Sequence, residues 1–169
     1  MALPVTLDMA KRQLRILSSD SDPEIEDAIK DAAAWVEDYT GHLLEAREIT
    51  ERFASFERVR LAAWPIAAEP VSVFHSGVPI IGARLASTTR PGTVLPAPNT
   101  AWPRITTGDV VEVTYTAGYA SAGDVPRAFV RAMLVLVGGF FNDREGGEVF
   151  AAAETTAKRL CRKRKSWRA

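Results

Sequence analysis

The chain has 169 residues, of which 47% are hydrophobic and 25% charged, and its formal net charge is zero. This composition is ordinary for a globular protein and predicts one domain with a substantial core. The single cysteine, Cys161, excludes an intramolecular disulfide framework and favours a reducing compartment. The first residues show neither a basic leader nor a sustained apolar run, so we expect an intracellular protein or part of an assembly built there.

Charge is distributed unevenly along the chain. Residues 1–57 carry 13 acids and 6 bases, residues 58–157 carry 8 of each, and residues 158–169 carry 7 bases and no acid. Such polarity can orient a molecule against copies of itself or against a partner. A solvated basic tail and an acidic helical surface explain the same distribution.

Residues 6–41 are predicted to form a helical hairpin. Thr6 can cap a first helix, and Asp22-Pro23 is a typical start of a second helix that ends at Gly41. The first helix presents one apolar stripe: Leu7, Ala10, Leu14 and Leu17. The second has a longer buried face: Ile25, Ala28, Ile29, Ala32, Trp35, Val36 and Tyr39.

Residues 43–117 have β character. Short strands are expected near residues 49–53, 59–61, 71–74 and 79–85, while the prolines of residues 88–103 predict a long loop. The clearest strand is 110–115, in which Val111, Val113 and Tyr115 share one face.

A buried core helix is predicted over residues 125–143, after an N-cap at Asp124 and a proline at Pro126. Residues 132–141 contain no charge, but this run is too short to cross a bilayer. A last helix is expected over residues 147–160, followed by a basic tail at 158–169. Its predicted inward residues are Val149, Ala152, Ala153, Thr156 and Leu160. The fold class is therefore α+β, mainly α: a helical bundle with a β insertion, in one domain over residues 1–157.

Catalytic signals are sparse. A zinc site from His42, His75 and Cys161 lacks the spacing of known ligand sets. Cys161 lies among cations that would lower its pKa if it were exposed, but no base is positioned beside it. We expect no enzyme, no catalytic residues, no metal and no cofactor.

Binding to nucleic acid is the alternative function. The run from Arg162 to Lys165, with Trp167 nearby, combines phosphate-seeking charge with a ring that could stack on bases. Against this reading, the rest of the chain is acidic or neutral and has no recognition-helix signature.

Several short motifs, in a fixed order over about residues 5–146, resemble the phage head–tail connector (adaptor) proteins of long-tailed phages and gene transfer agents. Each motif is weak alone, but their joint order is more specific. They are Tyr39-Thr40-Gly41, Leu61-Ala-Ala-Trp-Pro65-Ile66 with Val71-Ser-Val73, Tyr115-Thr-Ala-Gly-Tyr119, Val125-Pro126, and Phe140-Phe-Asn-Asp-Arg144-Glu145.

The resemblance implies a structural ring, usually a dodecamer, beneath the portal protein in the neck of a particle assembled in the bacterial cytoplasm. Such a ring extends the DNA channel without reading sequence and offers a platform for a stopper or tail-completion protein. Opposite charge at the two ends of the chain suits head-to-tail contacts between subunits.

The family's C-terminal segment is implicated in docking on the portal. Here the tail reads Leu160-Cys-Arg-Lys-Arg-Lys-Ser-Trp167, which departs from the family's usual ending. The corresponding docking residues would be Lys158, Arg159, Arg162, Lys163, Arg164, Lys165, Trp167 and Arg168. The structural core is expected to include Tyr115, Gly118, Tyr119, Pro126, Phe129, Met133, Leu136 and Phe140.

Overall fold

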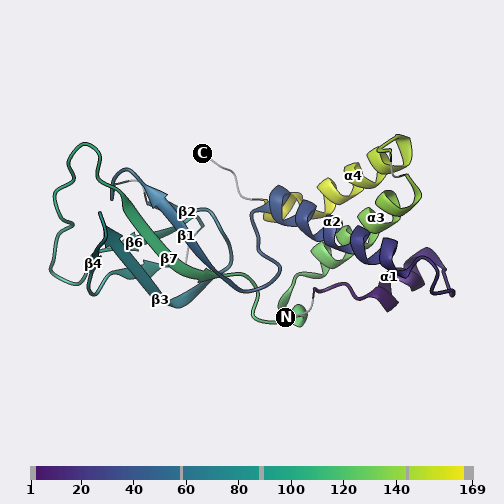
Figure 1. Ribbon diagram of the computed structural model, residues 1–169, viewed down its shortest axis with the longest axis horizontal. Helices are drawn as coiled ribbons and strands as arrows, with labels where there is room; N and C mark the ends of the chain where they lie inside the picture. The colour runs from purple at the N-terminus through teal and green to yellow at the C-terminus, as the bar shows by residue number, and fades with distance from the viewer. Residues whose placement is uncertain (1–2, 58, 88–89, 144, 166–169) are drawn as a thin grey trace. The chain divides into compact units, whose positions relative to one another are not determined.

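A computed structural model describes residues 3–57, 59–87, 90–143 and 145–165. The chain forms two compact units, one combining Met1–Glu45 with Tyr119–Ala169 and the other consisting of Ala46–Gly118. The first unit contains the α-helices and the second the strands (Figure 1). The predicted α+β class is confirmed, and residues 1–157, predicted as one domain, contribute to both units. Within the described ranges, every helix is too short or too polar to span a bilayer.

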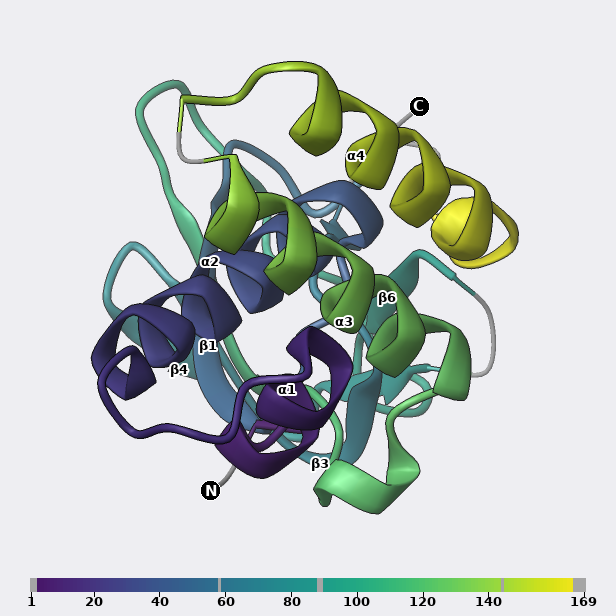
Figure 2. The ribbon, with the colours of Figure 1, turned by 90° about the vertical axis from the view of Figure 1, so that its right-hand side faces the viewer.

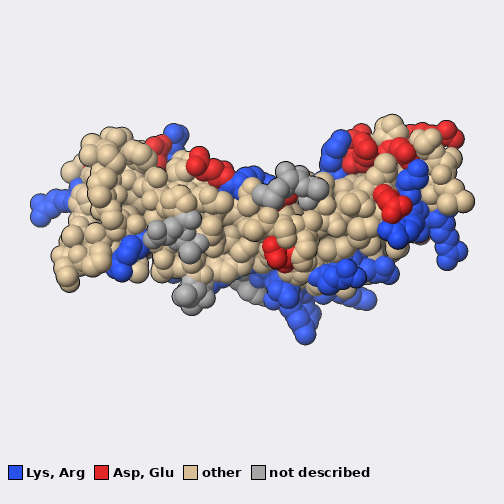
Figure 3. All heavy atoms as spheres, turned by 90° about the horizontal axis from the view of Figure 1, so that it is seen from below, with Lys and Arg blue, Asp and Glu red and all other residues tan. Residues whose placement is uncertain are grey.

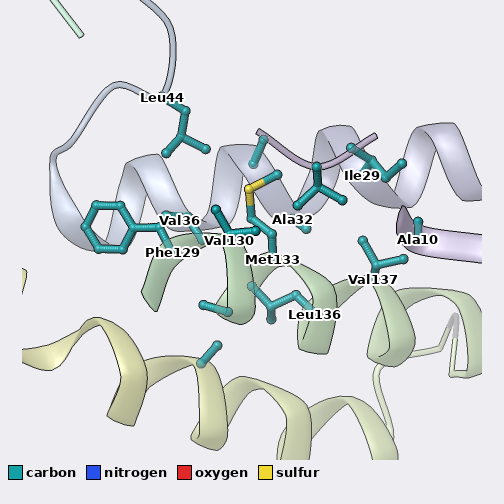
Figure 4. Packing of buried hydrophobic residues seen from close by; sticks show 14 of the residues in the cluster. Ala10, Ile29, Ala32, Val36, Leu44, Phe129, Val130, Met133, Leu136 and Val137 are labelled. Atoms are coloured by element: carbon teal, nitrogen blue, oxygen red, sulfur yellow. The ribbon is translucent and has the colours of Figure 1, made fainter. Parts of the chain in front are cut away.

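The helical unit is built around one central helix. Its elements are α1 (Leu7–Leu14), α2 (Asp22–Thr40), the short 3-10 turn η1 (Ala122–Asp124), α3 (Arg127–Asn142), α4 (Glu148–Cys161) and the turn η2 (Arg162–Arg164). Helix α3 lies between α2 and α4 and packs on both (Figure 4). Because it contacts neighbours on several sides, it contributes seven buried residues, and its uncharged stretch of residues 132–141 fits this burial.

The first helix ends earlier than its apolar stripe suggests. The Thr6 hydroxyl accepts a hydrogen bond from the Met9 N–H at 3.3 Å, as expected of a cap. At the other end Arg15 adopts a left-handed conformation with φ 59°, which stops the helix after Leu14. The prediction that Leu17 belongs to the apolar stripe of this helix is therefore wrong, because Leu17 lies beyond the helix and is 99% exposed.

The start of α3 differs from the expected N-cap. The Asp124 carboxylate accepts hydrogen bonds from the Ser121 N–H at 3.1 Å and the Ser121 hydroxyl at 2.8 Å. It thus closes the preceding turn η1, and α3 begins after Pro126 without a side-chain cap. Of the two predicted start signals, Asp124 and Pro126, only the fixed φ of Pro126 therefore acts at the start of α3.

The inward face of α4 is rotated relative to the prediction. Its fully buried residues are Ala157 and Cys161, whereas Val149 is 56% exposed and Ala152 and Thr156 are also exposed. The register is set by a close approach to α3. A Cβ added at Gly139 would lie 2.9 Å from the Ala153 Cβ and 3.3 Å from the Phe150 ring, so these two side chains occupy the space that the glycine leaves.

The β unit contains two antiparallel sheets. Its strands are β1 (Arg47–Phe53), β2 (Arg60–Leu61), β3 (Ile66–His75), β4 (Val78–Ile80), β5 (Arg84–Ala86), β6 (Gly92–Leu95) and β7 (Val111–Ala117). One sheet has the order β1-β7-β3-β4, and the other has the order β2-β6-β5. Strand β7 shows the predicted alternation, with Val111, Val113, Tyr115 and Ala117 all buried.

The predicted long loop of residues 88–103 contains a strand. Strand β6 pairs with β2 on one side and with β5 on the other, for example through Thr93 opposite Arg60 and opposite Ala86. Gly92 permits this arrangement, since a Cβ at that position would collide with the end of the Ile66 side chain. The prolines flank the strand and do not interrupt it. Because the segment as a whole is rich in proline, its composition predicted a loop.

Candidate interaction surface

The basic C-terminal segment continues a packed helix. Helix α4 runs through Lys158 and Arg159 to Cys161, and η2 follows directly. Six basic side chains are exposed there: Lys158, Arg159, Arg162, Lys163, Arg164 and Lys165. Two other predicted docking residues, Trp167 and Arg168, lie outside the described residues. In the space-filling view, Lys and Arg side chains gather along one margin of the helical unit, and most of the visible Asp and Glu side chains lie along the opposite margin (Figure 3).

Aromatic side chains of α2 hold this segment. The Lys165 Nζ atom lies 4.4 Å from the centroid of the Tyr39 ring, and Tyr39 stacks on Trp35 at a centroid distance of 4.9 Å. Trp35 also hydrogen bonds the Glu154 carboxylate, which forms a 2.8 Å ion pair with Lys158. The Lys158 hydrogen bond is the main reason that the pKa of Glu154 is lowered. The basic side chains of α4 and η2 therefore lie on an ordered segment that packs against α2.

Cys161 belongs to the helical core beneath this segment and is not a reactive group. Its side chain is fully buried beside Ala157 in the helical core. Burial raises the pKa of the thiol to about 11, because the thiolate would lose its hydration. The lowered pKa that nearby cations would cause in an exposed cysteine does not apply, since the bases point into solvent and the sulfur points inward.

The two histidines have separate structural partners. The His42 Nδ1 atom lies 2.8 Å from the Tyr119 hydroxyl, and the ring packs edge-on against Phe129 at 5.0 Å. In the β unit, the His75 Nε2 atom lies 3.1 Å from the Asp109 carboxylate. Among the described residues, no group of three or more His, Cys, Asp or Glu side chains could hold a metal ion.

The predicted core residues are divided between the units. Phe129, Met133 and Leu136 are fully buried in the helical core, with Tyr119 and Phe140 packed against it and Pro126 half-buried. Tyr115 is buried in the β unit, where Gly118 follows its strand with φ 117°.

Trp35 and Tyr39 form an aromatic dock for the C-terminal segment that was not predicted from the sequence, and neither were two exposed helix faces. Trp35 and Tyr39 were assigned to the buried face of α2, but both are only half-buried and meet the C-terminal segment. Their spacing of four residues was the available signal. One exposed face carries Asp27, Asp31 and Asp38 of α2, and the other carries Arg127 and Arg131 of α3. Separating each helix into its inward and outward residues would have found both.

No family model matches the chain, and no curated protein matches it. Its fold is nevertheless found in solved structures of gene transfer agent (GTA) particles. A chain in the virion of a native GTA particle is 21% identical, with a TM-score of 0.75, and the match covers 100% of this chain and 94% of that chain. A chain in the neck of an empty GTA particle, computed with C6 symmetry, is 20% identical with the same coverage and a TM-score of 0.73.

A third match is a chain in the neck of a native GTA particle computed with C12 symmetry. It is 22% identical, with a TM-score of 0.70, and covers 86% of this chain and 84% of that chain. At these identities the comparison establishes a shared fold along almost the whole length. The resemblance stated from sequence motifs is thus confirmed at the level of the fold.

Proposed function

We propose that this protein is a structural subunit of the neck of a phage or gene transfer agent particle, of the head–tail connector type. The observation that carries the proposal is the match over the full chain to GTA neck and virion chains. Under this proposal the protein is not an enzyme, and it acts through surfaces that the helical core and the sheets hold in position.

The subunits would form a ring, a dodecamer in the simplest case, beneath the portal protein. The symmetry of the necks that contain the similar chains, C6 and C12, supports a cyclic assembly. The ring would extend the channel through which DNA passes without sequence-specific contact, and it would present a platform to a stopper or tail-completion protein. Its place of action would be the particle neck, assembled in the host cytoplasm.

We further propose that the exposed bases of α4 and η2 dock on the portal. Removing residues 158–169 would not test this cleanly, because it deletes Cys161 from the core. A variant carrying Arg159→Gln, Arg162→Gln and Lys163→Gln removes three exposed charges and leaves that residue in place. The matched control, Arg60→Gln with Arg84→Gln and Arg104→Gln, removes three exposed charges from the β unit.

The measurement is co-sedimentation of each variant with portal complexes. We expect the first variant to lose binding and the control to bind like the natural protein. Equal binding by both variants would remove the docking role from the segment, and no binding by the natural protein would contradict the connector function itself.

Nucleic-acid binding is the second candidate, favoured by the six exposed bases on one ordered segment. It predicts that the logarithm of the affinity for duplex or single-stranded DNA falls linearly with the logarithm of the salt concentration. The three-glutamine variant should reduce this slope. Absence of binding at low salt would exclude this candidate while leaving the connector proposal intact.

A further inference from the structure

We propose that the outer faces of α2 and α3 are the two halves of one interface between neighbouring copies of this chain. The inference rests on the proposed ring and identifies the surfaces that would close it. The acidic face consists of Asp27, Asp31, Ala34 and Asp38 on α2. The basic–apolar face consists of Arg127, Arg131, Leu134, Val135 and Gly138 on α3.

The acidic face is unfavourable for α2 by itself. Its four residues are exposed and recur at helical spacing on the side opposite the core. Lys30 lies beside them and is bound to Asp27 at 2.8 Å, which leaves a net negative stripe. Like charges four residues apart destabilise a helix, and Asp38 stands in the last turn, where the helix dipole disfavours an acid. That turn contains no basic residue to offset it.

The basic–apolar face contains a glycine that the fold does not explain. Arg127 and Arg131 are exposed, whereas Leu134, Val135 and Gly138 are half-buried. A Cβ added at Gly138 would meet no atom within 4 Å, in contrast to Gly139, where Ala153 and Phe150 occupy the space. Glycine destabilises a helix interior relative to alanine. A second backbone approaching this face from outside would use the space that Gly138 leaves open.

The two faces are complementary in charge and in spacing. The pairs Asp27/Asp31 and Arg127/Arg131 each lie four residues apart, so two antiparallel helices can match Asp27 with Arg131 and Asp31 with Arg127. Helices α2 and α3 run in opposite directions within one copy (Figure 4), and the small rotation between neighbours in a ring preserves that relation. Arg131 also reaches Gln13, with an N–O distance of 3.3 Å, but this contact is exposed and leaves the charge uncompensated.

The faces cannot meet within one copy. Helices α2 and α3 pack together through their buried sides, so their outer faces point away from each other. Figure 2 shows α3 on the near side of the helical unit with α2 behind it. A surface on one side that fits a surface on the other produces head-to-tail association, which closes into a ring when the rotation between subunits allows it. The favoured occupant of each face is therefore a second copy.

Oxidative cross-linking tests the proposal directly. A chain carrying Asp31→Cys and Arg127→Cys should form disulfide-linked dimers, trimers and longer ladders on a non-reducing gel. The control carries Asp31→Cys with Thr155→Cys, which places the second thiol on the exposed side of α4. Because Cys161 is buried and present in both proteins, it contributes equally. Absence of a ladder, or equal ladders in the two proteins, would overturn the proposed interface.

Charge reversal gives an independent test in solution. One variant carries Arg131→Glu, and the other carries Asp27→Arg. Under oxidation in the double-cysteine background, each variant alone should lose most of its ladder, whereas an equal mixture should recover it, because every contact then joins opposite charges. Equal cross-linking alone and in the mixture would contradict the charge pairing.

The outcomes separate this inference from the function on which it rests. Ladders formed by a protein that never joins a neck would retain the interface and reject the connector function. Incorporation into necks without a ladder would retain the function and reject these faces. Suppression of the ladder by duplex DNA at low salt would assign the arginines to nucleic acid and also overturn the proposal.

Discussion

Adjacent glycines in α3 have different roles. At Gly139 an added methyl group would crowd Ala153 and Phe150, so we expect Gly139→Ala to destabilise the protein by about 1–3 kcal/mol. At Gly138 the space is open, and Gly138→Ala should stabilise the isolated protein by about 0.5–1 kcal/mol. Urea unfolding followed by circular dichroism measures both values. Effects of the same sign would show that the packing around α3 differs from this structure.

Because of the buried thiol, the free energy of unfolding should fall as the pH becomes alkaline. Because the pKa of Cys161 is raised to about 11 in the folded protein, unfolding allows the thiol to ionise near its usual value of about 8.5. Its contribution is fully present below that usual value and is lost as the pH rises toward 11. The free energy of unfolding lost over this pH range amounts to roughly 3 kcal/mol, at about 1.4 kcal/mol per pKa unit.

The test compares the free energy of unfolding of the natural protein and of Cys161→Ala across that pH range. The natural protein should lose stability more steeply, since other titrating groups affect both proteins alike. Parallel curves would mean that the thiol is accessible to water in the folded state.

At the scale of elements, Asp143 organises the start of α4. Its carboxylate accepts a hydrogen bond from the Phe150 N–H at 3.1 Å, and this bond is the main cause of its lowered pKa, with the Gly147 and Val149 N–H groups contributing. Asp143→Ala should therefore fray the first turn of α4. We expect faster amide hydrogen exchange at residues 149–150 in this variant and no change in a Glu145→Ala control.

The same contact has a defined pH dependence. A lowered pKa means that the stabilisation is present above the usual aspartate value of about 3.9 and is lost as the pH falls through the folded-state value. Exchange at these amides should approach that of Asp143→Ala in acid. Protection that persists at low pH would contradict this role.

In the β unit, Tyr115 connects β7 to β1 and to the chain before β3. Its hydroxyl donates to the Glu51 carboxylate and accepts a hydrogen bond from the Ala63 N–H at 3.3 Å. Burial raises the pKa of Tyr115 above its ordinary range. Tyr115→Phe leaves these partners without the hydroxyl and should cost about 1–3 kcal/mol.

The control for this change is Thr114→Val on the same strand. Thr114 shares a 2.8 Å hydrogen bond with Thr50, but the pair is exposed, so its loss should cost no more than about 0.5 kcal/mol. Urea unfolding measures both variants. Similar losses would indicate that the Tyr115 hydroxyl is not part of a buried network.

The sequence predicted the elements in which several signals agree. Helix α2 combines a proline start, a periodic apolar face and a glycine stop, and β7 alternates strictly. Strand β6 was missed because its four residues stand between prolines and depend on pairing with β5 and with the distant strand β2. The face of α4 was misassigned because alanine and threonine occur on all its sides, and only the close contact at Gly139 distinguishes them.

For the whole molecule, the motif order anticipated the shared fold, but it did not reveal the surfaces. Charge totals suggested one basic tail, whereas the structure extends α4 into that segment and supports it on Tyr39. The aromatic dock and the faces of α2 and α3 depend on which side of each helix is buried. That property follows from packing between segments far apart in the chain.

This arrangement predicts where the chain can be shortened. A chain that ends at Cys161 keeps the last buried residue of α4 and should remain folded, with the same helical circular dichroism spectrum apart from the lost end. A chain that ends at Ala157 loses Leu160 and Cys161 and should unfold at a lower temperature. Thermal unfolding compares the two, and equal midpoints would show that Cys161 contributes little to the core.

The pairing of β1 with β7 has a consequence for how the helical core assembles. Arg47 lies opposite Ala117, so the entry and exit of the inserted β unit are side by side. Once this ladder has formed, α2 and α3 are joined by an effectively short connection, and the entropy lost in bringing them together is much smaller than the length of the insertion suggests. The insertion can therefore lengthen or shorten at its far loops during evolution while the packing between α2 and α3 is preserved.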